Sequence, residues 1–117
     1  MDDKKEIFNQ VQQHVLTVSD QELAGLSVSI LANKFNIDRF KLSRQCKRQT
    51  GMTLENFLFK EKMTRAAFLL TGHNRITVKE VSEKVGYCTS DYFIRKFKKF
   101  HGMAPGKYKY FKAIPAI

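Results

Sequence analysis

A ten-residue segment occurs twice in this chain, and the repeat restricts how the chain can fold. Ser27–Asn36 (SVSILANKFN) matches Thr77–Gly86 (TVKEVSEKVG) at a shift of 50 positions, and the apolar residues fall in helical spacing. Both copies begin with a hydroxyl residue suited to an N-cap, and Glu80 completes a capping box with Thr77. Both end at a residue that tolerates positive φ. The repeat predicts two helices that each stop at a tight turn.

The similarity resumes after each turn at a shift of 51, so the second turn is one residue longer. We expect a second helix to begin near Asp38 in the first copy and near Thr89 or Ser90 in the second. Apolar and basic residues recur together: Leu42, Cys46, Gly51 and Met52 align with Phe93, Phe97, Gly102 and Met103, and Arg44, Lys47 and Arg48 align with Arg95, Lys98 and Lys99. The apolar pairs at i, i+4 mark one face, which leaves the basic residues to other faces. The glycines supply the left-handed residue that ends each helix.

The rest of the chain also predicts helices, so the fold class is all-α. The two prolines, Pro105 and Pro115, lie near the C-terminus, and no strand-like alternation is present. A packing helix is expected over about Lys4–Val18, with its apolar face formed by Ile7, Phe8, Val11, Val15 and Val18.

A linker helix is expected between the two copies, with Gly72 just past its end. Its apolar clusters (Leu54, Phe57 and Leu58, then Met63, Ala66, Ala67 and Leu70) are separated by Lys60-Glu61-Lys62, so each end can serve its own core. About 18 residues at 1.5 Å each give a length of about 27 Å. With the width of each unit, this length would set the two second helices about one turn of B-DNA, 34 Å, apart.

The length of 117 residues suits one domain of two lobes. We divide it into an N-terminal helix and lead-in (1–26), a first helix-turn-helix (27–52), the linker helix (53–72) and a second helix-turn-helix with a C-terminal helix or tail (73–117).

Charge is unevenly distributed along the chain, which has a formal net charge of +10. Residues 1–37 hold three Lys and five acidic residues, whereas residues 38–117 hold 18 Lys and Arg and six acidic residues. Such an excess predicts a polyanionic partner, with nucleic acid first and an anionic membrane surface or the ribosome as rivals. The chain has neither a signal-like start nor an apolar run of spanning length, so we expect a cytoplasmic protein and no membrane partner.

A helix pair with a tight turn and a basic second helix is the arrangement that places this helix in the major groove of double-stranded DNA. Arg44 and Arg95 can present a bidentate fork to guanine. The other aligned cations, Lys47, Arg48, Lys98 and Lys99, are better placed for phosphates. The side chains that differ between the copies would set sequence preference: Arg39, Phe40 and Ser43 in the first, and Ser90, Asp91 and Ile94 in the second.

Three of these differing residues have specific expected roles. Phe40 and Ile94 could pack on thymine methyl groups, with ordinary surface exposure as the alternative. Asp91 would be repelled by a phosphate, so we expect it to cap its helix, or else to accept a hydrogen bond from cytosine N4.

The segment Ile76–Pro105 resembles the signature of the AraC/XylS family DNA-binding domain, with Gly86-Tyr87, Tyr92-Phe93, Arg95, Phe97-Lys98-Lys99, Gly102 and Pro105 at the family's spacings. Leu42-Ser43-Arg44, Thr50-Gly51 and Lys62–Ala66 with Leu69-Leu70 resemble the family's first unit and linker. The resemblance covers about Ser27–Phe111. Tyr87 stands where Phe is commoner, Lys62 where Arg is usual, and Asp91 where a small or amide residue is common.

This resemblance implies seven helices, two helix-turn-helix subdomains on a linker helix, and binding to adjacent major grooves. It also implies activation of transcription by contact with RNA polymerase. Family base readers fall at positions matching Phe40, Ser43, Arg44, Ser90, Asp91, Ile94 and Arg95. Many members carry a further sensing domain, so the chain is either a stand-alone regulator or the C-terminal piece of a larger one. We see no small-molecule ligand site.

Two other functional classes remain as alternatives. A protein- or RNA-interaction module could reuse the fold, although we expect Tyr108, Tyr110 and Phe111 to belong to a tail that packs on the second unit. An enzyme is disfavoured because His14, His73 and His101 are scattered and no phosphate-binding glycine loop is present. We therefore expect no catalytic residues, no metal site and no cofactor. Cys46 and Cys88 lack metal-ligand spacing and predict reduced thiols, with redox sensing by Cys46 as the alternative.

Overall fold

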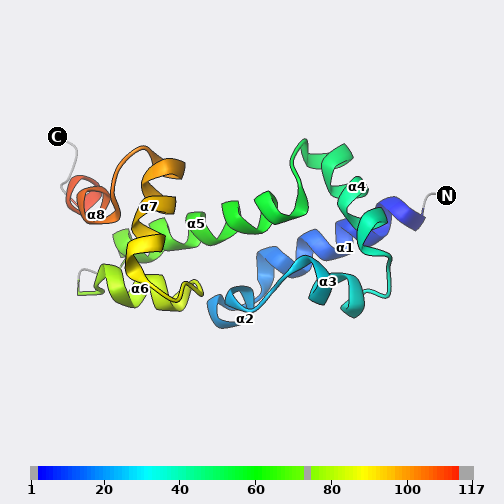
Figure 1. Ribbon diagram of the computed structural model, residues 1–117, viewed down its shortest axis with the longest axis horizontal. Coiled ribbons are helices and arrows are strands. Elements are labelled where there is room, and N and C mark those ends of the chain that lie inside the picture. Colours follow the sequence, from blue (N-terminus) through cyan, green and yellow to red (C-terminus); the bar gives the residue numbers. More distant parts are fainter. Residues whose placement is uncertain (1–2, 73–74, 114–117) are drawn as a thin grey trace. The chain divides into compact units, whose positions relative to one another are not determined.

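Helices form all the regular structure in residues 3–72 and 75–113, which are the residues that the computed structural model describes (Figure 1). The predicted all-α class is therefore confirmed. There are eight helices in these ranges: α1 (Asp3–Thr17), α2 (Asp20–Ala24), α3 (Val28–Lys34), α4 (Arg39–Thr50), α5 (Leu54–Gly72), α6 (Val78–Lys84), α7 (Ser90–His101) and α8 (Pro105–Ala113).

The short helix α2 was not expected as a separate element from the sequence. It forms because Ser19 caps it, its side chain accepting a hydrogen bond from the Glu22 backbone N–H at 3.2 Å. Gly25 ends it one turn later, and Leu23 is fully buried in the core. A capping residue and one buried apolar side chain thus stabilise a five-residue helix in the segment that precedes the first helix-turn-helix.

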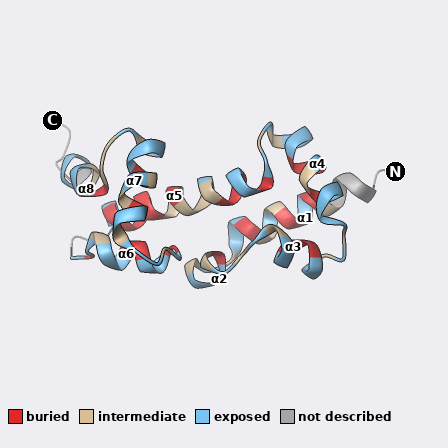
Figure 2. Ribbon diagram, in the orientation of Figure 1, coloured by how far each residue is buried: buried red, intermediate tan, exposed pale blue. Residues whose placement is uncertain are grey.

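The chain divides into two compact units, Met1–Glu61 and Lys62–Ile117, at the charged segment in the middle of α5. In the first unit, the buried faces of α1, α3 and α4 enclose a core completed by α2 and the start of α5 (Figure 2). Its members are Phe8, Val11, Val15, Leu23, Leu31, Ala32, Leu42, Cys46, Leu54, Phe57 and Leu58. In the second unit the buried apolar residues are Met63, Ala66, Ala67, Leu69, Leu70, Ile76, Val81, Val85, Phe93 and Phe97.

The predicted division of the linker helix between two cores is confirmed, since each apolar cluster of α5 is buried in its own unit. One detail of the prediction is wrong. Gly72 is the last residue of α5 itself and lacks positive φ, so it is not the left-handed residue beyond the helix. The residues that follow, 73–74, lie outside the described part.

The two predicted turns have the expected backbone conformations. Asn36 has φ of 53° and Gly86 has φ of 92°. In both turns the next residue donates its backbone N–H back into the preceding helix, from Ile37 to the Ala32 carbonyl and from Tyr87 to the Ser82 carbonyl, each at 3.0 Å. Equivalent hydrogen bonds at equivalent positions show that the sequence repeat is a structural repeat.

Caps fix where the first helix of each pair begins. The Ser27 side chain accepts from the Ile30 N–H at 3.2 Å, and the predicted capping box between Thr77 and Glu80 is present. In that box the Thr77 backbone N–H donates to Glu80 Oε1 at 2.9 Å, which lowers the pKa of the Glu80 carboxyl. The second copy therefore has a more completely satisfied helix start than the first.

A further helix covers each pair, α1 against α4 and α8 against α7. The predicted face of α1 is confirmed, with Phe8, Val11 and Val15 fully buried. The tail prediction is only partly confirmed. The Tyr108 ring contacts Phe97 edge-on at 5.3 Å, whereas Tyr110 and Phe111 are 65% and 53% exposed and do not pack into the unit.

None of the described helices combines the length and apolar character needed to cross a lipid bilayer.

The glycine that ends α7 provides a test of the backbone argument. Gly102 has φ of 84°, and a Cβ placed there would meet nothing within 4 Å. The substitution Gly102→Ala should therefore lower the free energy of unfolding by about 1–2 kcal/mol, because an alanine is strained in the left-handed conformation. Gly72→Ala is the matched control in the same unit, because it adds Cβ to open space at helical φ and should leave stability unchanged or higher.

All four tyrosines lie in the second unit and the chain has no Trp, so tyrosine fluorescence during urea unfolding reports on that unit. A lower midpoint for Gly102→Ala than for Gly72→Ala is expected. Equal midpoints would contradict the role given to Gly102.

Candidate nucleic-acid interface

The second helices of the two pairs, α4 and α7, are built alike. Each has 12 residues, and their first residues, Arg39 and Ser90, are separated by the predicted shift of 51. Asp38 caps α4 by accepting from the N–H groups of Phe40 and Lys41 at 2.8 and 3.2 Å. Gly51 and Gly102 end the helices in the left-handed conformation, as predicted.

The apolar pairs at i, i+4 of both helices are fully buried: Leu42 with Cys46, and Phe93 with Phe97. In α4 the expected base readers Arg39, Phe40 and Arg44 are exposed, Ser43 is half-buried, and the expected phosphate contacts Lys47 and Arg48 are exposed. In α7 the corresponding set has Asp91, Arg95, Lys98 and Lys99 exposed, with Ser90 and Ile94 half-buried. Every residue expected at the interface is therefore accessible at least in part.

The capping role expected for Asp91 is wrong. Thr89 is the N-cap of α7, with its Oγ1 accepting from the Tyr92 N–H at 3.3 Å. Asp91 is the second residue of α7 and lies in its first turn, where a carboxylate interacts favourably with the positive end of the helix dipole. Its exposed side chain is thus left available to a partner.

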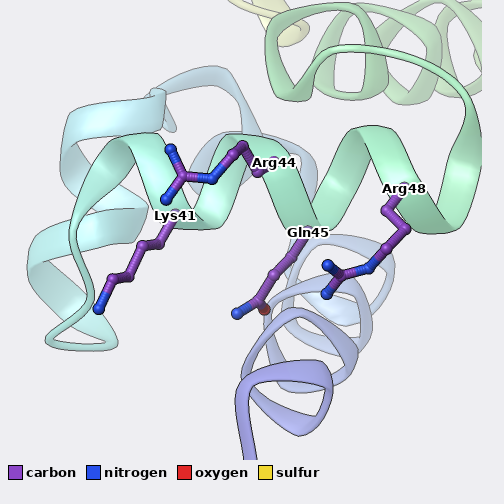
Figure 3. A pocket seen from close by; sticks show the side chains of 4 residues that line it. All are labelled: Lys41, Arg44, Gln45 and Arg48. Carbon is purple, nitrogen blue, oxygen red and sulfur yellow. The ribbon is translucent and has the colours of Figure 1, made fainter.

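One functional candidate in α4 was missed by the sequence reasoning. Lys41, Arg44, Gln45 and Arg48 line a shallow surface hollow on α4 (Figure 3). Three cations at i, i+3 and i+7 share this side of the helix, a spacing visible in the sequence. Because Lys41 has no basic counterpart in the second copy, alignment of the repeats did not select it.

The fourth residue of the hollow, Gln45, is 3% exposed and fixes α4 against α1. Its Oε1 accepts a hydrogen bond from the Phe8 backbone N–H at 3.2 Å. In Figure 3 its side chain extends from α4 toward α1. The cations around it are therefore carried on a helix whose orientation is set by a buried polar contact as well as by apolar packing.

Aromatic rings accompany the cations of α7. The Arg95 guanidinium carbon lies 5.6 Å, and the Lys96 Nζ 5.4 Å, from the centroid of the Tyr92 ring. Tyr92 stacks on Tyr87, and the centroids of the two rings are 5.7 Å apart. Burial, and to a smaller extent the electrostatic effect of the neighbouring Tyr92 hydroxyl, raises the pKa of Tyr87 to about 12. In the first unit, the Arg39 guanidinium carbon lies 5.0 Å from the centroid of the Phe40 ring.

The two units differ in net charge, although by less than the division at residue 37 suggested. Residues 1–61 hold nine Lys and Arg and eight acidic residues, whereas residues 62–117 hold 12 and three. The first unit is thus almost neutral overall, and its positive potential comes from cations gathered on α4. The second unit is basic over most of its elements, so its electrostatic attraction to a polyanion is broader.

The histidines that the structure describes occupy packing positions. The His14 ring contacts Phe35 edge-on at 5.7 Å, and His101 Nε2 lies 3.0 Å from the Met63 carbonyl oxygen. His73 lies outside the described residues. Within the described part, no three His, Cys, Asp or Glu side chains come together as a metal site would require.

Comparison with known proteins places this pair of units in a class, the helix-turn-helix DNA-binding proteins. A family model described as a helix-turn-helix domain matches residues 31–110. The chain belongs to this helix-turn-helix family, in its AraC-type branch.

A solved structure, the C-terminal domain of AraT, a response regulator from Geobacillus stearothermophilus, is 30% identical with a TM-score of 0.83, covering 93% of this chain and 88% of that one. The DNA-binding domain of AdpA, solved with a target DNA, shares the fold at 19% identity and a TM-score of 0.71, covering 92% and 90%.

A curated relative, the transcriptional activator RhaR of Escherichia coli, is 29% identical over 80% of this chain. The chain spans 36% of the length of the curated relatives that it matches first.

The cysteine of α4 allows a test of burial in this helix. Burial raises the pKa of the Cys46 thiol, and its sulfur lies 3.5 Å from the Met52 carbonyl oxygen, whereas Cys88 is exposed. At pH 8 we expect Ellman's reagent to modify one thiol per folded chain quickly and the second only after unfolding, because the thiolate is the attacking species. Cys88→Ser should remove the fast phase, and Cys46→Ser should leave it. A fast phase that survives Cys88→Ser would show that Cys46 is reactive.

Proposed function

We propose that this chain binds double-stranded DNA in a sequence-specific manner and regulates transcription, with α4 and α7 each lying in a major groove. The observation that carries the proposal is the repeated second helix. In both units an exposed arginine and two exposed cations occupy the same positions, while the opposite face is buried. Two surfaces with a repeated charge pattern suit a duplex, whose grooves also repeat.

Within each groove we assign base reading to the residues near the start of the helix and phosphate contact to those near its end. Arg44 and Arg95 would read guanine through two hydrogen bonds each. The residues that differ between the units would distinguish the two sites: Arg39, Phe40 and Ser43 in the first, and Ser90, Asp91 and Ile94 in the second. Phosphates would be held by Lys47, Arg48, Lys98 and Lys99. Lys41 lies near the start of α4, but we add it to this set because it lines the same hollow as Arg48.

We further propose that the two units read neighbouring stretches of DNA and that binding activates transcription through contact with RNA polymerase. The name of RhaR as an activator supports the direction of the effect. Membership of a family of DNA-binding regulators supports a binding role over catalysis. Such a protein would act in the cytoplasm, at the nucleoid. A longer protein that contained this chain would use the same contacts of α4 and α7 to bind DNA.

The base-reading assignment is tested by selecting bound duplexes from a random pool with the unchanged chain, Arg44→Ala and Arg95→Ala at one stated salt concentration. We expect two short blocks of preferred sequence about one helical turn apart. Each substitution should relax one block, at a cost of about 1–3 kcal/mol. Convergence on single-stranded or RNA ligands, or no convergence, would favour the alternative of an interaction module that lacks sequence-specific duplex binding.

The phosphate assignment is tested by the salt dependence of duplex affinity. The affinity falls as salt rises, and the steepness of log K against log salt should decrease by about 0.9 in Lys47→Gln and in Lys98→Gln, because each substitution removes one phosphate contact. Affinity should fall alike for all sequences, since phosphate contacts carry no base information. Lys107→Gln, on α8, also removes one charge from the second unit and is the control; a slope change equal to that of Lys98→Gln would show a diffuse charge effect instead.

A further inference from the structure

The aromatic ring of Tyr92 lies between the core of the second unit and its base-reading arginine. Arg95 follows Tyr92 by three residues, and the distance from its guanidinium carbon to the ring centroid is 5.6 Å. This distance is within the range in which the negative face of an aromatic ring attracts a cation. Tyr92 is 43% exposed, so the ring and the arginine meet at the surface.

Tyr92 is itself held in place by a series of ring contacts. It stacks on Tyr87 at an interplanar angle of 29°, and Tyr87 contacts Phe93, which is fully buried, with centroids 5.7 Å apart. Tyr87 is fixed further by its backbone N–H bond to the Ser82 carbonyl in the turn. The Tyr92 ring is thus attached to the core and provides a fixed surface for the arginine.

The first unit lacks this arrangement at the equivalent position. Lys41 occupies the place of Tyr92, and Arg44 shares its hollow with Lys41 and Arg48. Like charges around Arg44 repel one another until an anion neutralises them. The two arginines at matching positions of the repeat therefore have different surroundings before any DNA is present.

We propose that Tyr92 is a positioning residue that orients the Arg95 guanidinium for base reading in the second unit. This inference rests on the proposed function of Arg95 as a base reader. A guanidinium held on a ring face loses less side-chain freedom on binding and keeps its N–H edge available for a bidentate contact. The equivalent contact of the first unit, by Arg44, would have to be ordered by the DNA itself.

The test measures base discrimination, defined as the ratio of affinities for the preferred duplex and for one substituted at the base pair that Arg95 reads. Tyr92→Leu should lower this ratio about two- to fivefold. Tyr92→Phe keeps the ring and should leave the ratio as it is in the unchanged chain. Phe100→Leu is the matched control on the same helix, since Phe100 is 40% exposed and its ring contacts His101. It should leave the ratio unchanged.

A double-mutant cycle separates this inference from the function on which it rests. If Arg95→Ala leaves discrimination unchanged, Arg95 is not a base reader and the proposed function is wrong at this site. If Arg95→Ala relaxes discrimination but Tyr92→Leu does not, only the positioning role is overturned. An equal effect of Tyr92→Leu with and without Arg95 would also overturn it, because the ring would then act by another route.

A measurement without DNA completes the test. The 15N order parameter of the Arg95 Nε–H group in the free chain should fall in Tyr92→Leu and remain unchanged in Tyr92→Phe and Phe100→Leu. An unchanged order parameter in Tyr92→Leu would show that the ring does not restrain the arginine.

Discussion

Burial of one apolar pair on each second helix is the contact on which the rest of the structure depends. Leu42 with Cys46, and Phe93 with Phe97, are removed from solvent. Because each pair spans one helical turn, it fixes the rotation of the helix about its own axis. The exposed cations of α4 and α7 therefore lie on the faces that point away from the core. The surface chemistry of both units is thus a consequence of the packing beneath it.

The sequence predicted these features well because they depend on local spacing. The start of α6, the two turns and the ends of α4 and α7 follow from residue types at fixed offsets, such as Thr77 with Glu80, and Gly51 and Gly102 at the helix ends. The pattern also predicted the two cores that share α5. Such signals are short-range, and a repeat presents each of them twice, so each copy supports the interpretation of the other.

The features that sequence reasoning missed depend on competition between neighbours or on contacts between elements. Thr89 and Asp91 are both good capping residues. Because α7 begins at Ser90, the preceding residue, Thr89, is its N-cap. Tyr110 and Phe111 are aromatic, but α8 packs through Tyr108 and leaves them exposed. The contact between Gln45 and Phe8 joins residues 37 positions apart, and no local pattern predicts such a pair.

The two copies of the repeat share the buried apolar residues and the turns but differ in the side chains that their second helices expose. The first unit is nearly neutral and concentrates its cations on α4, including Lys41 where the second unit has Tyr92. The second unit is broadly basic and carries its aromatic rings on and beside α7. An aromatic support restrains an arginine in a basic environment at no cost in added charge. In a nearly neutral unit, additional cations supply attraction to phosphates that the rest of that unit does not provide.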